Sequence, residues 1–541
     1  MADRRATIVM TARERHSLAE AAIEAIVART AAPYRFVYLD VQSPDPLREK
    51  LSRRGGEWGL EVVRFDEPLW PQEARNRLAA SIDTDYAVFI DNDVIVEHGW
   101  LDALVACADE TGAGIVGPLY LLGDGRKPAR IHMAGGKLTE STTPEGRVLA
   151  ESHLLGDSDP AQVAHTVVRR PCDFVEYHCM LIRTSLIRDG TLLDPAIRCV
   201  HEHIDTALGV RQSGHAVYLE PSARVTYLGL ADYALDDLAF YRERWSSDAA
   251  QSSIDAFCRK WNVVDDDRSF GGTRKFVMDH VAQVDPIRPS SLRRDDQRGF
   301  MGRDELRQTR SDLLDGATVR GYQRNELALI ANAYHLAHIL MDGGYRPCGR
   351  PFIAHLVGCA SVLVRYGFRA ETVAAGLLHA AYSHCPAHRD GAAAAVNAVC
   401  AVLGGRDSAL ERRVRAYSLR EAEAAAATDR SVPHATLSVF DSELLAIATA
   451  NELDMHLSGE IRYSGRTDVA GSRLLAQIGH ACELLGVPGL EASLRSAQRD
   501  STAVPSEFVT RVQASYRIGQ DKRSAVPMVG NALAALRQGG A

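Results

Sequence analysis

The sequence predicts two domains of different fold class, an α/β domain with a mostly parallel sheet and, after it, an all-helical domain. Over roughly the first 120 residues, short β-branched or apolar runs alternate with amphipathic segments, which is typical of a parallel sheet covered by helices. Beyond residue 320 the strand pattern ends, and apolar residues recur at positions i, i+3, i+4 and i+7. A chain of 541 residues is also too long for a single hydrophobic core.

The first domain is predicted as a succession of strands and helices joined by short loops. In chain order we expect a strand at 6–12, a helix at 17–30, a strand at 34–41, a helix around 46–55, a strand at 60–65, a helix at 71–82 and a strand at 86–91. From about 165 to 230 the pattern continues as a more mixed extension of the same sheet, with a helix near 201–214 and a strand at 216–221.

The second half is predicted to contain helices only. Helical periodicity is found at 325–344, 351–367, 370–384 and 442–457. The stretch between the two halves is polar and charged, with almost no apolar periodicity, and is interpreted as a linker. We therefore divide the chain into an α/β domain at 1–284, a linker at 285–320, a helical domain at 321–505 and a C-terminal tail at 506–541.

Composition and charge exclude several classes of protein. The formal charge is −8 and the basic residues are dispersed, which argues against a nucleic-acid-binding protein. The ten cysteines form no CxxC pair, so we expect reduced thiols rather than disulfides or a zinc knuckle. No apolar run is long enough for a secretory signal or a membrane span. A soluble, cytoplasmic protein without a transmembrane segment is the expectation.

The segment "AVFIDNDVIVEHGWLDAL" (87–104) places two carboxylates where a buried strand ends. Ligands of open α/β sheets bind beyond the carboxyl ends of the strands, and Asp91 and Asp93 stand at such an end. Two neighbouring carboxylates repel each other unless a cation or hydrogen-bond donors compensate them. Mg²⁺ and Mn²⁺ prefer such oxygen ligands. A solvated loop after the strand is the alternative explanation.

Several motifs in the same order resemble those of inverting glycosyltransferases of the GT-A fold, the large family 2. "VYLDVQSPD" contains the Asp-x-x-Ser-x-Asp pattern, and "EARNRLAAS" resembles the family's Ala-Arg-Asn helix. "VFIDNDV" followed by "GWLDAL" resembles its DxD strand and the helix after it, and "HEHIDTALGVRQSG" with "AVYLEPSARVTYLG" resembles its acceptor side. The resemblance covers roughly the first 250 residues and implies a mixed, mostly parallel, Rossmann-like sheet.

The resemblance implies a hexosyltransferase-like bacterial enzyme that transfers a sugar from a UDP- or GDP-linked donor to an unknown acceptor, with inversion. It also implies a bound Mn²⁺ or Mg²⁺ that stabilises the departing diphosphate. The donor-binding positions it implies are Thr11, Arg13, Asp40, Asn76 and Asp91. Asp91 and Asp93 would form the metal site, with Asp93 as the direct ligand and Asp91 as a ribose or indirect partner. The Gly- and polar-rich region 123–165 is expected on the acceptor side.

Two positions depart from the family pattern. The family places its general base in an acidic motif that matches Glu202, His203 and Asp205, and His203 stands where the base carboxylate is expected. A histidine could accept the proton, as could Glu202, and an ordinary acidic helix N-terminus is also possible. Tyr227 stands where many members have a metal-binding histidine, and a protonated phenol is a poor ligand.

The helical half resembles HD-type metal phosphohydrolases, especially the hydrolase domain of bacterial alarmone enzymes. More closely it resembles uncharacterised HD-like domains with a His-Leu-x-Gly…Gly-Leu-x-His-x-x-Tyr pattern. His355 and His379 match the two histidines and define a possible second pocket. Ala380 replaces the aspartate of the HD pair, and Asn451 is nearest to the distant aspartate, with Asp454 three residues on. A hydrogen-bonded core is the alternative explanation of both histidines.

Three functions remain open from the sequence. The first is a metal-dependent glycosyltransferase with an accessory helical domain. The second is a non-catalytic nucleotide-sugar sensor or scaffold, which the changes at His203 and Tyr227 would suit. The third is phosphohydrolase activity in the helical half, and Ala380 argues against it.

Overall fold

The computed structural model describes residues 5–12, 14–31, 33–124, 128–288, 298–341, 344–346, 348–384, 400, 405, 408–426, 437–463 and 472–502. The chain divides into two compact units, Met1–Gln283 and Val284–Ala541, and each is described by itself. Three parts of the sequence prediction lie outside the described residues: Arg13, the centre of the expected linker at 289–297, and the expected tail at 506–541.

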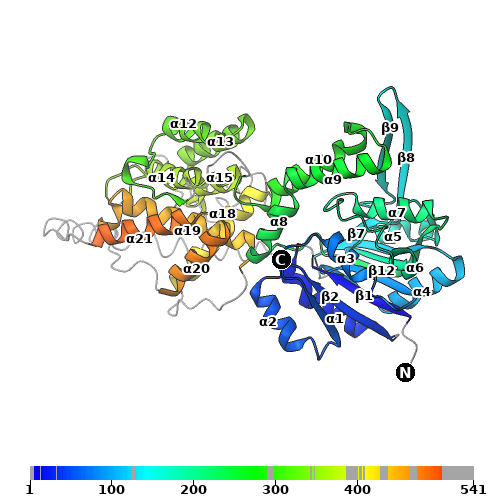
Figure 1. Ribbon diagram of the computed structural model, residues 1–541. Coiled ribbons are helices and arrows are strands. Elements are labelled where there is room, and N and C mark those ends of the chain that lie inside the picture. The colour runs from blue at the N-terminus through cyan, green and yellow to red at the C-terminus, as the bar shows by residue number, and fades with distance from the viewer. Residues whose placement is uncertain are drawn as a thin grey trace. The chain divides into compact units, whose positions relative to one another are not determined.

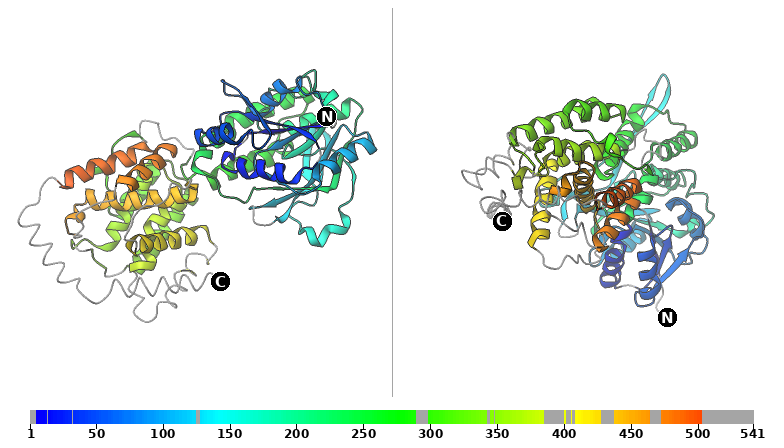
Figure 2. Two further views of the ribbon diagram at one scale, coloured as in Figure 1. Left: turned by 90° about the horizontal axis from the view of Figure 1, so that it is seen from below. Right: turned by 90° about the vertical axis from the view of Figure 1, so that its left-hand side faces the viewer.

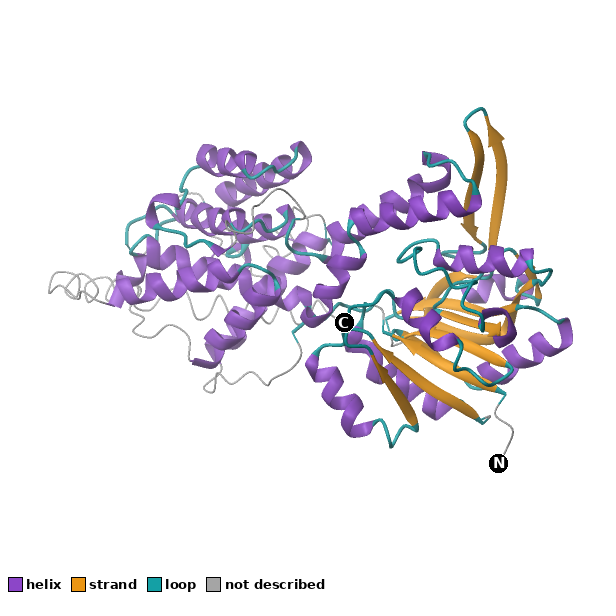
Figure 3. Cartoon of the chain, in the orientation of Figure 1, coloured by secondary structure: helices purple, strands orange, loops and turns teal. Residues whose placement is uncertain are grey.

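The N-terminal unit is built on one large mixed sheet and a separate hairpin (Figures 1 and 3). Its strands are β1 (Ala6–Thr11), β2 (Tyr34–Asp40), β3 (Leu60–Arg64), β4 (Tyr86–Asp91), β5 (Val94–Val96), β6 (Ile115–Gly123), β7 (Pro128–Met133), β8 (Gly136–Thr143), β9 (Gly146–His153), β10 (Arg170–Cys172), β11 (Cys179–Arg183) and β12 (Val217–Tyr227). The order across the sheet is β10-β12-β6-β11-β4-β1-β2-β3, with β5 beside β12 and β7 beside β6. The predicted mixed, mostly parallel sheet is confirmed.

Helices of this unit follow the strands they connect and cover the sheet. They are α1 (Ala19–Arg29), α2 (Asp45–Arg54), α3 (Pro71–Ala79), α4 (Trp100–Thr111), α5 (Pro160–Val163), α6 (Thr184–Ile187), α7 (Glu202–Gln212), α8 (Leu238–Arg244), α9 (Ser247–Trp261) and α10 (Asp267–Val284), with short 3₁₀ turns at His16–Leu18, Ala164–Thr166 and Leu235–Asp237. Strands β1 and β4 are buried along their whole length, because helices cover both faces of a parallel sheet.

The strand order reverses at β1, and this reversal positions the site. Strand β1 pairs in parallel with β2 on one side and with β4 on the other. The connections after β1 and β2 lead away from β4, so the loops after β1 and β4 diverge at the carboxyl edge, which is where ligands of open α/β sheets bind. Thr11, at the end of β1, is level with Asp91, at the end of β4.

The Gly- and polar-rich region 123–165 consists largely of strands in its described part. After β7, the antiparallel strands β8 and β9 form a hairpin that projects from the sheet (Figure 1). Both faces of β8 are mostly exposed, so the hairpin lacks the alternation of apolar and polar residues that marks a half-buried strand. Its turn end is held by α9 and the residues after it, because Val264 N donates to Arg147 O at 2.8 Å and Arg147 Nη1 donates to Trp261 O at 2.8 Å.

The C-terminal unit is helical, as predicted, and among its described residues no strand occurs. Figure 2 shows its helices packed side by side. They are α12 (Arg310–Val319), α13 (Arg324–Leu340), α14 (Phe352–Arg365), α15 (Ala370–Leu378), α16 (Ala381–His384), α18 (Ala409–Ala426), α19 (Val439–Leu457), α20 (Ser472–Leu484) and α21 (Pro488–Thr502), with 3₁₀ turns at Arg303–Glu305 and Glu460–Tyr463.

Part of the expected linker belongs to this helical unit. Helix α12 lies within 285–320 and buries Leu313 and Ala317, two apolar residues that form too short a stripe to be recognised in a charged sequence. The buried core of the unit is formed mainly by α14, α15 and α19. None of the described helices is long and apolar enough to cross a membrane.

Candidate functional site

Asp91 lies at the carboxyl edge of the sheet and is held by two buried neighbours. Arg75 Nη2 donates to Asp91 Oδ1 at 3.1 Å, and neither side chain is exposed. His178 Nδ1 lies 3.0 Å from Asp91 Oδ2. A carboxylate only accepts hydrogen bonds, so Nδ1 carries the imidazole proton and Nε2 keeps its lone pair. Both oxygens of Asp91 are therefore engaged by the protein.

Asp93 lies in the tight turn between β4 and β5 and is almost completely buried. The turn is fixed by the backbone, since Leu228 N donates to Asp93 O at 2.9 Å, and by Asn92 Nδ2, which donates to Arg15 O at 3.0 Å. Arg15 Nε stands 4.0 Å from Asp93 Oδ2. The guanidinium also packs at 4.1 Å on the ring of Tyr233. The turn thus presents a buried carboxylate in a fixed position.

Two of the residues expected to bind the donor, Thr11 and Asp40, are the last residues of β1 and β2. Asp40, the last residue of β2, is 1% exposed and accepts a hydrogen bond from Ser43 N at 3.2 Å. Arg64 Nε and Arg48 Nε stand 3.3 and 3.7 Å from Asp40 Oδ2. Thr11 Oγ1 accepts from Arg75 Nε at 3.2 Å, so its hydroxyl faces the same buried guanidinium as Asp91.

Asn76, expected among the donor-binding residues, is engaged elsewhere. Its Nδ2 donates to Gly190 O at 2.7 Å and to Leu193 O at 2.6 Å. These bonds fix the loop after α6. The preceding residue, Arg75, reaches Asp91 instead, because successive side chains on a helix point about 100° apart.

The three expected acid–base residues on α7 have different environments. Asp205 accepts from Trp261 Nε1 at 2.7 Å and lies 2.8 Å from Lys260 Nζ, so it ties α7 to the end of α9. His203 Nε2 stands 3.7 Å from Glu151 Oε2 on the hairpin. Burial alone would lower the pKa of His203, but the attraction of the nearby Glu151 carboxylate outweighs burial and raises it. Glu202 is buried at the first position of the helix.

A chain of buried polar contacts connects α7 to Asp91. Tyr177 Oη and Thr206 Oγ1 are 2.7 Å apart, and Gln72 Nε2 donates to each at 3.3 Å. Arg75 Nη1 lies 3.5 Å from Gln72 Oε1, and its guanidinium packs at 4.0 Å on the ring of Tyr177. The carboxyl edge and the N-terminal turn of α7 are therefore one packed unit.

Sequence reasoning missed His178, Glu176 and Arg75 as parts of the site. His178 stacks on Tyr227 with ring centroids 3.9 Å apart, so the tyrosine at the position where a metal-binding histidine was expected lies beside an imidazole from the turn before β11. The available signal was the polar pair in "FVEYHCML", where Glu176 and His178 interrupt an apolar run. Their partners are far away in sequence, which hid the connection.

A divalent cation fits the geometry at the end of β4. One ligand atom from each of Asp91, Asp93 and His178 lies within 4.8 Å of the others. Since Asp91 is hydrogen-bonded through both oxygens, Asp93 is the carboxylate best placed to coordinate a cation directly. Oxygen donors with one imidazole suit a cation such as Mn²⁺.

The sequence of the N-terminal unit matches a known family model. Residues 7–156 match the sequence model described as Glycosyl transferase family 2. The chain therefore carries a glycosyltransferase family 2 domain in its N-terminal unit.

Comparisons with individual proteins give similar relatives. Over 174 residues the chain is 25% identical to the pre-mycofactocin glycosyltransferase of Mycobacterium tuberculosis. The aligned part covers 32% of this chain and 33% of the relative. Over 265 residues it is 23% identical to the uncharacterized protein y4gI of Sinorhizobium fredii. This alignment covers 48% of this chain and 28% of the relative. The chain thus spans about a third or less of the length of these relatives.

Solved structures similar to the chain include the two crystal structures that follow. GalNAc-T7 with UDP, GalNAc and Mn²⁺ is 18% identical, with a TM-score of 0.34, over 41% of this chain and 42% of that chain. Residues 1–349 of S. aureus TarS in complex with UDP-GlcNAc are 12% identical, with a TM-score of 0.31, over 68% and 90%.

The helical unit brings its two predicted histidines together. The rings of His355 and His379 are 5.5 Å apart. Asp454, rather than Asn451, completes the group, since His355 Nδ1 lies 2.6 Å from Asp454 Oδ2. Asn451 Nδ2 instead donates to Tyr417 Oη at 3.3 Å.

Arg350 is already bound to Asp454, the carboxylate that an HD-type metal would need as a ligand. Arg350 donates to both oxygens of Asp454, at 2.8 and 3.0 Å, and its Nη1 is 3.9 Å from Glu460. His355, Asp454 and Glu460 have ligand atoms within 4.8 Å of one another, but the guanidinium already neutralises them. A fixed cationic side chain at this position opposes binding of a second cation.

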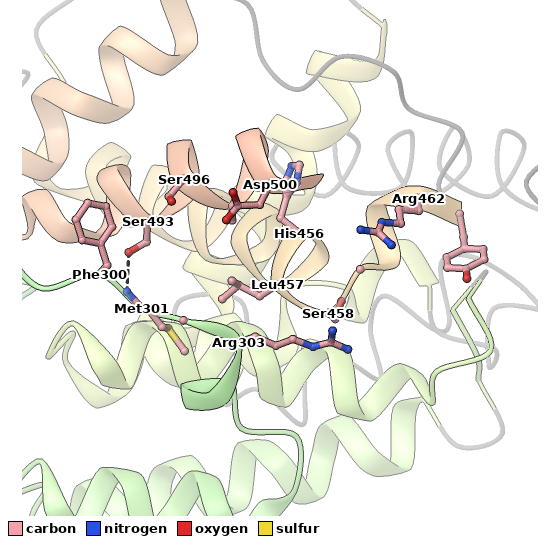
Figure 4. Close-up of a pocket in the computed structure, with 14 residues that line it drawn as sticks. Phe300, Met301, Arg303, His456, Leu457, Ser458, Arg462, Ser493, Ser496 and Asp500 are labelled. Atoms are coloured by element: carbon pink, nitrogen blue, oxygen red, sulfur yellow. Dashed lines mark hydrogen bonds between the residues drawn. The ribbon is translucent and has the colours of Figure 1, made fainter. Parts of the chain in front are cut away.

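A separate cavity of about 560 Å³ opens in the helical unit (Figure 4). Polar and charged side chains contribute to its lining, including Arg303, His456, Ser458, Arg462 and Asp500. His355 and His379 are not among the lining residues. The expected second pocket and this cavity are therefore different features of the unit.

Proposed function

We propose that the N-terminal domain transfers a sugar from a nucleoside-diphosphate donor to an acceptor hydroxyl, with inversion and with the help of a divalent cation. The observation that carries the proposal is the buried pair Asp91 and Asp93 at the carboxyl edge of β4, beside the ends of β1 and β2. The family 2 match over residues 7–156 supports it, as does the similarity to a protein named a glycosyltransferase.

The residues at this edge of the sheet would have different roles in binding the donor. Asp93 would coordinate the cation, and the cation would supply positive charge to the diphosphate that departs. Asp91 would remain hydrogen-bonded to Arg75 and His178, which makes it a positioning residue for the turn. Asp40 can accept a hydrogen bond from a nucleobase, and the half-exposed side chains of Arg48 and Arg64 lie beside it.

The acceptor side needs a proton acceptor for the attacking hydroxyl. Of the three expected residues, Asp205 is committed to Lys260 and Trp261. We therefore assign the role to His203, which Glu151 orients, with Glu202 as the alternative. The pKa of Glu151 is lowered to about 2, because the neighbouring imidazoles outweigh the effect of burial. An ionised Glu151 would stabilise His203 after it takes the proton.

The direct test is a screen of common nucleotide sugars with Mn²⁺ and Mg²⁺, read by release of free nucleoside diphosphate. We expect release from one donor class and a loss of at least about 100-fold in Asp93→Asn. Asp102→Asn is the matched control, because Asp102 is exposed on α4 only nine residues away. Equal activity in Asp93→Asn and the native protein would refute the proposal.

A non-catalytic sensor is the second candidate, favoured by the replacement of the family's base and metal ligand by His203 and Tyr227. It predicts saturable donor binding, measured by calorimetry, without release of nucleoside diphosphate in any acceptor mixture. The same screen therefore separates the two functions.

A further inference from the structure

Three imidazoles surround one carboxylate on the acceptor side of the sheet. The closest nitrogen is His132 Nε2, 2.7 Å from Glu176 Oε2. His178 Nε2 is 3.5 Å from the same oxygen, and His153 Nε2 is 3.5 Å from Glu176 Oε1. The four residues come from β7, β9 and the turn before β11, so the fold assembles them from three separate segments.

We propose that His132, Glu176 and His178, with His153 as a fourth ligand, form a binding site for a transition-metal cation of the Zn²⁺ class. This site is centred on Glu176 and not on Asp93, although His178 also belongs to the group of possible ligands at Asp93. Binding to it does not depend on the proposed transferase activity. Ligand atoms of the first three residues lie within 4.8 Å of one another. Two or three imidazoles with one carboxylate are a donor set that suits zinc and similar cations.

The spacing agrees with tetrahedral coordination. Ligand atoms about 2.0–2.1 Å from a tetrahedral Zn²⁺ are about 3.3 Å from each other, and the measured 2.7 and 3.5 Å lie on either side of that value. The ring centroid of His132 is 5.2 Å from that of His153 and 5.4 Å from that of His178. A cation can therefore enter with small side-chain adjustments.

A second, independent feature is the support behind His178. Its Nδ1 donates to Asp91, which leaves the Nε2 lone pair directed toward Glu176. Metal-binding histidines commonly donate their other ring nitrogen to a carboxylate, which fixes the tautomer and the ring orientation. Tyr227 holds the same ring by stacking at an interplanar angle of 19°. The hydrogen bond to Asp91 and the stacking on Tyr227 both fix the orientation of the His178 ring, which favours metal coordination.

The ligands are also accessible. The side chains of His132, His153, Glu176 and His178 are 22, 29, 15 and 12% exposed, so a cation can reach them from solvent. A purely structural ion cluster is the competing explanation, and it predicts no retained metal.

Metal binding to the full chain, free of any polyhistidine tag, tests the proposal. Protein stripped with a chelator is titrated with Zn²⁺ against a chromophoric competitor, and Co²⁺ is substituted to record the visible absorption of the bound ion. We expect one tight equivalent, with zinc-edge absorption spectra that report at least two imidazoles. Less than 0.2 equivalents of retained Zn²⁺ would overturn the proposal.

Variants assign the equivalent to this site. Glu176→Gln and His132→Ala should lose the tight equivalent, and Asp91→Asn should weaken it by about 10–100-fold through His178. His165→Ala, an exposed histidine of the same domain, is the matched control. His355→Gln tests the cluster in the helical unit and should retain binding. Thermal unfolding of each metal-free variant shows that the fold is kept.

One variant separates this proposal from the proposed function. Asp93→Asn should keep the tight Zn²⁺ equivalent while it loses donor turnover. Retention of the equivalent in Glu176→Gln, or its loss in His355→Gln alone, would place the metal elsewhere and contradict the proposal. Zinc binding without any donor turnover would leave this site standing and refute only the transferase.

Discussion

Arg75 and Asp91 form an ion pair of 3.1 Å in which neither side chain is exposed to solvent. Removal of one partner of a buried pair leaves an uncompensated charge in a medium that solvates it poorly. Arg75 is further fixed by Thr11 and by the ring of Tyr177. The pair therefore holds the end of β4 in the position from which Asp93 projects.

Arg75→Leu is expected to lower the free energy of unfolding by about 3–5 kcal/mol, because it leaves Asp91 buried beside an apolar side chain. The measurement is urea or thermal unfolding of the full chain. Arg77→Leu is the matched control on the same helix, since Arg77 forms surface ion pairs with Glu67 and Glu73, and solvent-exposed ion pairs contribute little to stability. Equal losses in the two variants would contradict the structural role of the pair.

The pH dependence of activity should report the His203–Glu151 pair. His203 accepts a proton only when neutral, and its pKa is raised above the ordinary value of 6.5 because the attraction of the Glu151 carboxylate outweighs burial. The acid limb of kcat/KM is therefore expected above pH 6.5, with activity rising as the pH increases through it. Glu151→Gln should move this limb to lower pH.

Glu140→Gln is the control for that experiment, because Glu140 lies on the same hairpin and is exposed in a pair with Arg147. It should leave the limb unchanged. A limb that stays in place in Glu151→Gln would show that another group, such as Glu202, accepts the proton.

Asp205→Asn is expected to act on stability more than on chemistry. Its carboxylate accepts from Trp261 and Lys260, and charged hydrogen bonds of this kind contribute about 1.5–3 kcal/mol. Unfolding should show a loss of that size, while kcat of the folded fraction stays within about threefold of the native value. A loss of kcat of about 100-fold with unchanged stability would instead make Asp205 the proton acceptor.

Gly358→Ala tests the packing of the helical cluster. A Cβ at Gly358 would stand 1.8 Å from Asp454 Oδ1, so the substitution must displace the carboxylate that His355 and Arg350 share. We expect a loss of about 3 kcal/mol or more in the stability of the helical unit. Gly316→Ala on α12 has no atom within 4 Å of its Cβ and should be neutral or slightly stabilising. Similar behaviour of the two variants would count against the described cluster.

The fold was largely predictable because its signals are local. Strand–helix alternation identified β1 to β4 with their helices, and helical periodicity identified α13, α14 and α19. The β8–β9 hairpin was not predicted, because β8 is mostly polar and exposed on both faces. Helix α12 was missed, because only Leu313 and Ala317 of its ten residues are buried.

The site was only partly predictable, because its contacts join distant residues. Asp91 and Asp93 follow a buried strand and could be identified, whereas the contact between His178 and Asp91 spans 87 positions. Arg75 and Asn76 are neighbours in sequence, but only the helix orientation decides which one faces Asp91. In the same way, Asp454 faces His355 and Asn451 faces Tyr417, although both lie on α19.

The most direct test of the central claim is the position of the cation. Crystals of the full chain soaked with Mn²⁺ and a nucleoside diphosphate should show anomalous density within coordination distance of the Asp93 carboxylate and of the diphosphate oxygens. The Arg75–Asp91 pair should remain intact beside it. Anomalous density confined to the histidine cluster, with Asp93 bound to neither the ion nor the diphosphate, would contradict the account.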